Sequence, residues 1–302
     1  MKRGRQTLRV KSRSLWDVRR LLTAVEVRAI NEADIEALSL LIDRLARGYT
    51  TTSSHLETDY VYRSRTNPGR TPFNAVGELS HPNADCAKLG RANLSGKPVF
   101  YCSSTDNCAI FEQQSSIGDV ITVSQWRAKQ KNTGPYCFVI GDLTHKDKFN
   151  RPLVGKGTMF AVESFRKLTG KQLYKKSLLI DEHFSSWFKS EGEEFYNLTN
   201  AIAKFYMSSD KIDGLVYESV AAERGFNLAL KPSSLDVFFE PSAAYMCRMV
   251  AIDAKSGLPI VKIEAASTSF GRDGSINWIE TSVLPTGFKS YLDKLPIGAG
   301  YE

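Results

Sequence analysis

The 302-residue chain is 42% hydrophobic and 11% aromatic, a composition typical of folded globular proteins and not of disordered ones. No apolar run approaches the roughly 18 residues that cross a membrane, and the basic start is not followed by the apolar segment of a secretory signal. We therefore expect a soluble, cytoplasmic protein. The net charge of +7 is concentrated in residues 1–13, which carry six positive charges and no acid, so the rest of the chain has a net charge of only +1.

The basic segment at residues 1–13 has two interpretations. Such an arm can bind the phosphate backbone of a nucleic acid. A solvated, disordered tail needs no partner, and we prefer that interpretation. Because the body of the chain is nearly neutral, nucleic acid is not an expected partner beyond this arm.

Common catalytic and metal-binding motifs are missing from the sequence. It contains no GxSxG, no HExxH, no Walker loop and no GxGxxG after a strand, and its four histidines lack metal-ligand spacing. The five cysteines are odd in number and have no paired CxxC spacing, which predicts reduced thiols. We therefore expect neither a metal site nor a histidine-based hydrolase.

Two short helices are predicted within residues 14–48. Ser14 is a candidate cap for the first, whose apolar side chains recur at helical spacing, and a second stripe begins at Ile35 and ends before Gly48. The polar stretch TTTSSHLE around Ser53 then predicts a linker.

From Tyr60 onward, short apolar runs alternate with turn residues and predict strands at 99–101, 120–123, 137–140, 215–220 and 237–239. Ser190 and Glu193 form a possible capping box before a helix with an apolar stripe over 195–206. Beyond Tyr245, YMCRMVAI and LPIVKIEA predict a hairpin, and FKSYLDKL predicts a last helix. Many short strands with a few helices indicate an α+β (mixed α/β) fold.

Isolated polar side chains at the ends of these apolar runs are the candidate functional residues, because α/β proteins often build sites there. Each has an ordinary alternative: an arginine is usually a surface cation, a tyrosine a packed aromatic, a glutamate a solvated helix residue and a serine a strand residue facing water. The candidates are Tyr62, Arg63, Arg91, Asn93, Tyr101, Glu112 and Ser219.

In order and spacing, five segments between about residues 60 and 230 resemble the RES domain family, which is named for an arginine, a glutamate and a serine. They are VYR at 61–63, GRANLSGKPVFY at 90–101, AIFE at 109–112, FYNLTNAIAKFY at 195–206, and DGLVYESV at 213–220 with GFNLAL after it. The chain departs from the family in having Glu218 where proline is common, and Arg65 is an alternative for the first arginine.

The resemblance implies an ADP-ribosyltransferase-like RES domain over residues 58–250, preceded by a short helical segment and followed by a C-terminal strand extension at 251–302. It also implies a toxin that consumes NAD+ by phosphorolysis, with inorganic phosphate, or by hydrolysis, and that is neutralised by a helix-turn-helix antitoxin. NAD+ is then a substrate, and no cofactor is expected.

Cleavage of the nicotinamide–ribose bond leaves positive charge on the ribose, which a carboxylate can stabilise. We therefore assign catalysis to Glu112, with Arg91 and Ser219. Arginine forks suit the diphosphate, and a tyrosine can lie against a ring. The expected NAD+-binding residues are Arg63, Arg91, Tyr101, Ser219, Tyr62 and Asn93.

Two other functions stay open. One is transfer of ADP-ribose to a protein or nucleic acid, for which the basic arm could recruit the target. The other is a non-catalytic RES-like protein that binds a partner; retention of the polar residues argues against it, and Glu218 keeps it open.

Overall fold

The computed structural model describes residues 13–31, 35–46, 52–131, 133–149, 153–190, 192–219, 225–253 and 259–281. The predicted basic arm lies outside these residues except for Arg13, and so does the predicted last helix, FKSYLDKL. The C-terminal extension predicted at 251–302 is described up to residue 281, with a gap at 254–258.

One mixed sheet of ten strands runs through the described part of the chain, in the order β1-β5-β6-β7-β3-β2-β4-β8-β9-β10. The β5–β6 pair is parallel and the other neighbours are antiparallel. Together with the helices, this sheet confirms the α+β class. The strands are β1 (Thr52–His55), β2 (Tyr60–Thr66), β3 (Phe100–Ser103), β4 (Val120–Ala128), β5 (Tyr136–Ile140), β6 (Gly214–Glu218), β7 (Phe226–Leu230), β8 (Phe239–Ile252), β9 (Pro259–Ser267) and β10 (Ile279–Glu280).

Strands β6 and β7 are buried on both faces, and their sequences are accordingly mostly apolar. Successive side chains of a strand point to opposite faces. In β6, Leu215 and Tyr217 therefore join one core cluster with the helices, while Val216 joins a second cluster with Phe100.

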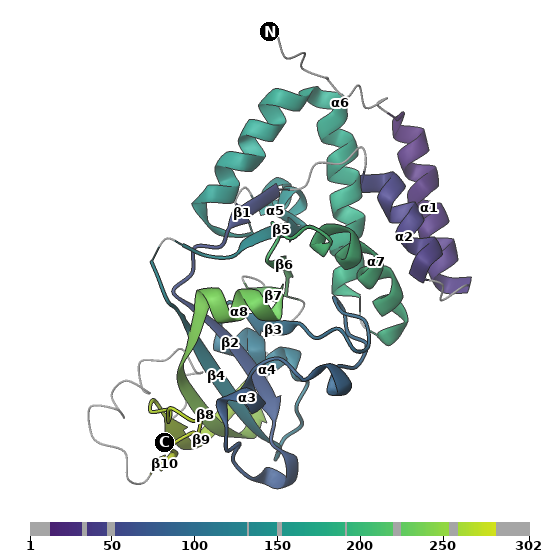
Figure 1. The fold of residues 1–302 in the computed structure, drawn as a ribbon. Helices are drawn as coiled ribbons and strands as arrows, with labels where there is room; N and C mark the ends of the chain where they lie inside the picture. Colours follow the sequence, from purple (N-terminus) through teal and green to yellow (C-terminus); the bar gives the residue numbers. More distant parts are fainter. Residues whose placement is uncertain are drawn as a thin grey trace.

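Four helices cover the face of the sheet that carries Leu215 and Tyr217: α1 (Leu15–Asn31), α2 (Ile35–Ala46), α6 (Gly155–Lys189) and α7 (Tyr196–Met207). Figure 1 shows α1 and α2 side by side along α6 and α7, with α6 arching over one end of the sheet. The arch bends at Gly170, whose φ of 72° lies outside the helical range. The predicted cap of α1 is confirmed, because Ser14 Oγ accepts a hydrogen bond from the Asp17 amide at 3.1 Å.

The remaining helices are short and lie near strand ends. They are α3 (Val76–Leu79), α4 (Asp106–Glu112), α5 (Asp142–Phe149) and α8 (Pro232–Phe238). Strands β8 and β9 pair as the predicted hairpin and extend the sheet beyond β4.

Three predictions about local structure are wrong. The predicted linker around Ser53 is strand β1, because its backbone pairs with β5 and the Ser53 hydroxyl lies 2.6 Å from the Tyr136 hydroxyl. The predicted strand 237–239 is mostly helix α8, which begins at Pro232, a residue suited to the first helical position. The capping box is absent, since Ser190 ends α6 and donates to the Ser186 carbonyl, and α7 begins after Phe195 without a side-chain cap.

The five cysteines are free thiols, and four of them are buried. Among the described residues, no helix is both long and apolar enough to span a membrane.

The N-terminal helices contribute to the main core, and a pair of leucines in α2 tests this. Leu38 is fully buried, whereas Leu40 is 67% exposed. We expect Leu38→Ala to lower the free energy of unfolding by about 2–5 kcal/mol, because it leaves a cavity. Leu40→Ala should change it by less than about 0.5 kcal/mol. Chemical denaturation measures both, and equal effects would show that α2 is not part of the core.

Candidate functional site

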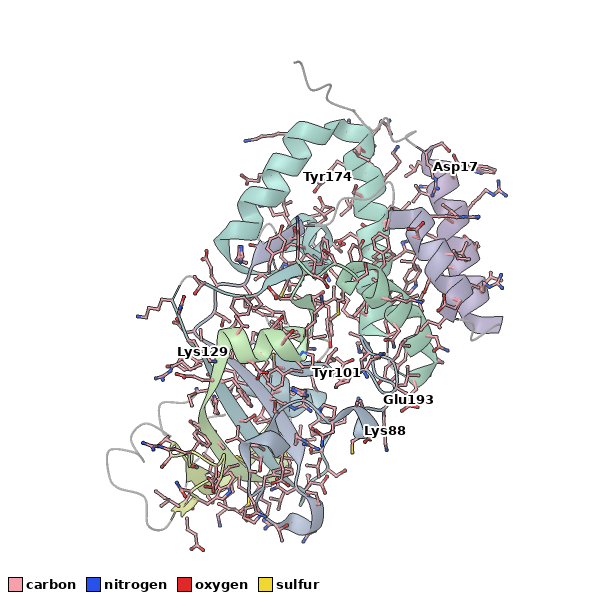
Figure 2. The ribbon with its side chains drawn as sticks, viewed as in Figure 1. Asp17, Lys88, Tyr101, Lys129, Tyr174 and Glu193 are labelled. Atoms are coloured by element: carbon pink, nitrogen blue, oxygen red, sulfur yellow. The ribbon has the colours of Figure 1, made fainter. Side chains whose placement is uncertain are left out.

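A cavity of about 540 Å³ opens where the strands β2, β3, β6 and β7 meet α4, the loop before β3 and the start of α7. Figure 2 shows Tyr101, one of its lining residues, between the helices α6 and α7 and the strands of the sheet. The lining includes Arg63, Arg65, Arg91, Tyr101, Glu112 and Tyr196.

Strand register brings one row of side chains to the floor of the cavity. Tyr62 of β2 is paired with Ser103 of β3, Ser103 with Asn227 of β7, and Asn227 with Tyr217 of β6. Residues directly opposite one another in an antiparallel pair share a face. Four strands therefore place these side chains next to one another, and all four line the cavity.

Glu112 is the last residue of α4, a helix that begins directly after β3. Thr105 caps α4 by accepting a hydrogen bond from the Cys108 amide at 3.2 Å. Glu112 Oε1 accepts hydrogen bonds from the Ser219 hydroxyl at 3.0 Å and from Asn227 Nδ2 at 2.7 Å. These two hydrogen bonds fix the position of the carboxyl group. The second oxygen, Oε2, accepts no hydrogen bond from the described residues.

Arg63 lies on β2 just past the pair that joins β2 to β3. Its Nη1 donates to the Tyr101 carbonyl at 2.7 Å, and its guanidinium lies 5.6 Å from the centre of the Phe100 ring. Burial, and secondarily the nearby Arg65, lowers the pKa of Arg63 to about 10. The side chain therefore remains a cation at neutral pH.

Arg91 is held by the C-terminal end of α6. Its Nη1 donates to the carbonyls of Phe188 and Ser190, which are among the carbonyls that a helix end leaves without intrahelical partners. The guanidinium also lies 5.9 Å from the centre of the Tyr196 ring. Arg91 thus connects the cavity to the α6 end and to the start of α7.

The loop that carries Arg91 is tightly built around a glycine. A Cβ at Gly90 would lie 2.5 Å from Asn93 Oδ1 and 3.0 Å from the Tyr101 hydroxyl. Tyr101 OH accepts from the Ala92 amide at 2.6 Å and donates to Asn93 Oδ1 at 2.9 Å. Burial raises the pKa of Tyr101, so its hydroxyl stays protonated and keeps this bond.

Asn93 is the candidate that the structure does not bring to the cavity. Its amide nitrogen donates to the carbonyls of Lys88 and Leu94, and its oxygen accepts from Tyr101. These contacts hold the loop that presents Arg91.

Ser219 and Glu218 lie at the end of β6, beside the cavity. Ser219 is buried and reaches the site through Glu112 rather than as part of the lining. Glu218 Oε2 lies 2.8 Å from Lys189 Nζ, and Glu218 does not line the cavity. The extra carboxylate is therefore neutralised by α6 and does not add negative charge to the site.

The structure brings together five of the seven predicted residues, Tyr62, Arg63, Arg91, Tyr101 and Glu112, and places Ser219 in contact with Glu112. Twelve further lining residues were not among these candidates. Among them, Asn227 and Tyr196 lie in the motifs GFNLAL and FYNLTNAIAKFY, and Arg65 is the alternative for the first arginine, so these three could have been found from the sequence. Ser103 belongs to a segment whose sequence gives no clear functional signal.

The charges of the cavity favour an anionic ligand with a cationic part. Three arginines and one glutamate line it, and within the described residues Glu112 forms no ion pair with any of the arginines. Among the same residues no group of three or more histidine, cysteine, aspartate or glutamate side chains could hold a metal ion.

Comparison with known proteins gives two findings. A search of curated proteins found none similar to this chain. One solved structure, the crystal structure of the M.tuberculosis MbcT-MbcA toxin-antitoxin complex, shares 10% sequence identity over 71% of this chain and 93% of that chain, with a TM-score of 0.35, a value too low to establish a common fold.

The comparison with protein families is decisive. The model of the RES domain matches residues 60–245, which include β2 to the first half of β8 and every residue of the cavity lining. The chain belongs to the RES domain family.

Proposed function

We propose that this chain cleaves the nicotinamide–ribose bond of NAD+, by phosphorolysis or hydrolysis, and acts as a toxin. The observation that carries the proposal is one cavity with a hydrogen-bonded carboxylate and three arginines that are not paired with it. Charges left unneutralised in a cavity are costly without a ligand, and such groups are candidates for function.

The chemistry of NAD+ matches these charges. Arg63 and Arg91 are already oriented by backbone carbonyls, so their remaining N–H groups can bind the diphosphate with little loss of side-chain entropy. The tyrosine rings of the lining, among them Tyr101 and Tyr196, supply flat surfaces for the nicotinamide or adenine ring.

Glu112 would stabilise the positive charge that develops on the ribose as nicotinamide leaves. Nicotinamide departs as a neutral base, so no general acid is needed, and electrostatic stabilisation is the main requirement. We assign Oε2 of Glu112, which accepts no hydrogen bond from the described residues, to the contact with the ribose. Ser219 would then orient the carboxylate through Oε1.

A partner is part of the proposal, because unrestrained loss of NAD+ would harm the cell that makes the protein. Membership of the RES domain family supports a toxin, and we propose a helix-turn-helix antitoxin as its inhibitor. Transfer of ADP-ribose to a macromolecule is the second candidate function, since the same carboxylate and arginines would serve it.

The products of NAD+ distinguish these reactions. We expect purified protein incubated with NAD+ to release nicotinamide, and phosphate to change the second product from ADP-ribose to its 1″-phosphate if the reaction is phosphorolysis. NMR identifies the products. Radiolabel from NAD+ on a macromolecule would show transfer instead, and no nicotinamide release from inhibitor-free protein would contradict the proposal.

Replacing Glu112 tests its catalytic role. Glu112→Gln keeps the shape and removes the charge, so kcat for nicotinamide release should fall roughly a hundredfold or more. Glu240→Gln is the matched control, because Glu240 pairs with Arg127 at an exposed position away from the cavity. Full activity of Glu112→Gln would show that the carboxylate is not catalytic.

Replacing Arg91 tests the diphosphate clamp. We expect Arg91→Lys to raise KM for NAD+ about tenfold or more, because an ammonium group cannot reproduce the planar fork. Arg248→Lys is a suitable control, since Arg248 makes a two-pronged contact with Glu264 outside the cavity. Steady-state kinetics measures both variants, and an unchanged KM for Arg91→Lys would rule out the clamp.

A further inference from the structure

Two linked hydrogen bonds run from Ser103 of β3 through Asn227 of β7 to the Glu112 carboxylate. The Ser103 hydroxyl donates to Asn227 Oδ1 at 2.7 Å, and Asn227 Nδ2 donates to Glu112 Oε1 at 2.7 Å. The register of β3 and β7 places Ser103 directly opposite Asn227, so backbone pairing sets this contact.

The hydroxyl of Ser103 decides which way the Asn227 amide points. An asparagine side chain has one oxygen that accepts and one nitrogen that donates. Because Ser103 donates to the oxygen, the nitrogen is turned toward Glu112. The opposite orientation would put an oxygen against the carboxylate and leave the Ser103 hydroxyl without its acceptor, a costly arrangement for side chains that are 3% and 4% exposed.

We propose that Asn227, oriented by Ser103, is a positioning residue that fixes the Glu112 carboxyl group on its Oε1 side. This inference rests on the function proposed above, in which the charge of Glu112 stabilises the transition state. Asn227 acts through Glu112, because its amide nitrogen donates to the carboxyl oxygen Oε1 at 2.7 Å.

The role of Asn227 can be tested by the pH dependence of kcat, because several groups around Glu112 do not change charge near neutral pH. Burial raises the pKa of the Cys108 thiol on α4 and, more strongly, of the Tyr217 phenol on β6, and the pKa of Arg63 on β2 is about 10. These three groups keep their charge states from about pH 5.5 to about pH 8.5. The other titratable side chains of the cavity lining are Tyr62, Arg65, Arg91, Tyr101, Cys102 and Tyr196.

Asn227→Asp is the central test because it is isosteric and places a second carboxyl group beside Glu112. Two adjacent carboxyl groups share a proton and titrate as a pair. We expect the ratio of variant to wild-type kcat for nicotinamide release to change at least about tenfold between about pH 5.5 and about pH 8.5. Ser103→Ala should lower kcat with little change in KM, because it frees the amide to turn.

Asn67→Asp is the matched control. Asn67 is equally buried, its amide nitrogen donates to the Thr71 carbonyl, and its oxygen accepts from the Thr122 hydroxyl at 2.9 Å, but it does not line the cavity. The ratio of Asn67→Asp kcat to wild-type kcat should be independent of pH. The proposal would be overturned if the ratio of Asn227→Asp kcat to wild-type kcat were also independent of pH. Circular dichroism checks that the Asn227→Asp variant is folded.

A measurement without substrate separates this inference from the proposed function. In protein labelled with ¹³C at the glutamate carboxyl groups, the Glu112 signal is identified by its loss in Glu112→Gln. We expect its titration midpoint to differ by at least about one pH unit between wild type and Asn227→Asp. An inert wild type would refute only the proposed function, whereas an unchanged midpoint would refute the role of Asn227.

Discussion

Strand β7 lies between β3 and β6, and both the core and the site depend on these two pairings. Their register aligns Tyr101 with Ala229 and Leu215, and Ser103 with Asn227 and Tyr217. The first row packs against the helical core, and the second, two residues along each strand, lies on the same face beneath the cavity. A shift of register by one residue would send both rows to the opposite face. The burial that stabilises the sheet therefore also holds the site in place.

The site combines charges that are positioned separately. Glu112 is held by side chains of β7 and of the residue after β6, whereas Arg63 and Arg91 are held by main-chain carbonyls of β3 and of the α6 end. Neutral partners fix the geometry without cancelling the charges. This arrangement suits the ligand proposed above, which carries an anionic diphosphate and develops a cation on its ribose.

The helices α1 and α2 are connected to the site through the core. They pack in one cluster with α6 and α7, and the end of α6 holds Arg91 while Asn200 of α7 donates to the Gly90 carbonyl. Lys189 of α6 also neutralises Glu218. The helical layer thus supports the Arg91 loop from behind.

Much of this protein could be predicted from its sequence. Local patterns predicted α1, α2, α7 and most strand positions, because hydrophobic period and capping are properties of neighbouring residues. The motif order predicted the family and six residues that lie at the cavity or touch Glu112. The polar edge strand β1 and the helix α8 were mispredicted, since tertiary pairing and a proline start outweighed the local pattern.

Only the tertiary structure decided how the charges are partnered. Glu112 and its two donors are separated by 107 and 115 residues, and Arg91 and the carbonyls it caps by 97 and 99. No local rule links positions so far apart, because their contacts follow from strand order and helix packing. The sequence by itself determined which chemical groups are present and in what order, and the sheet decided which of them meet.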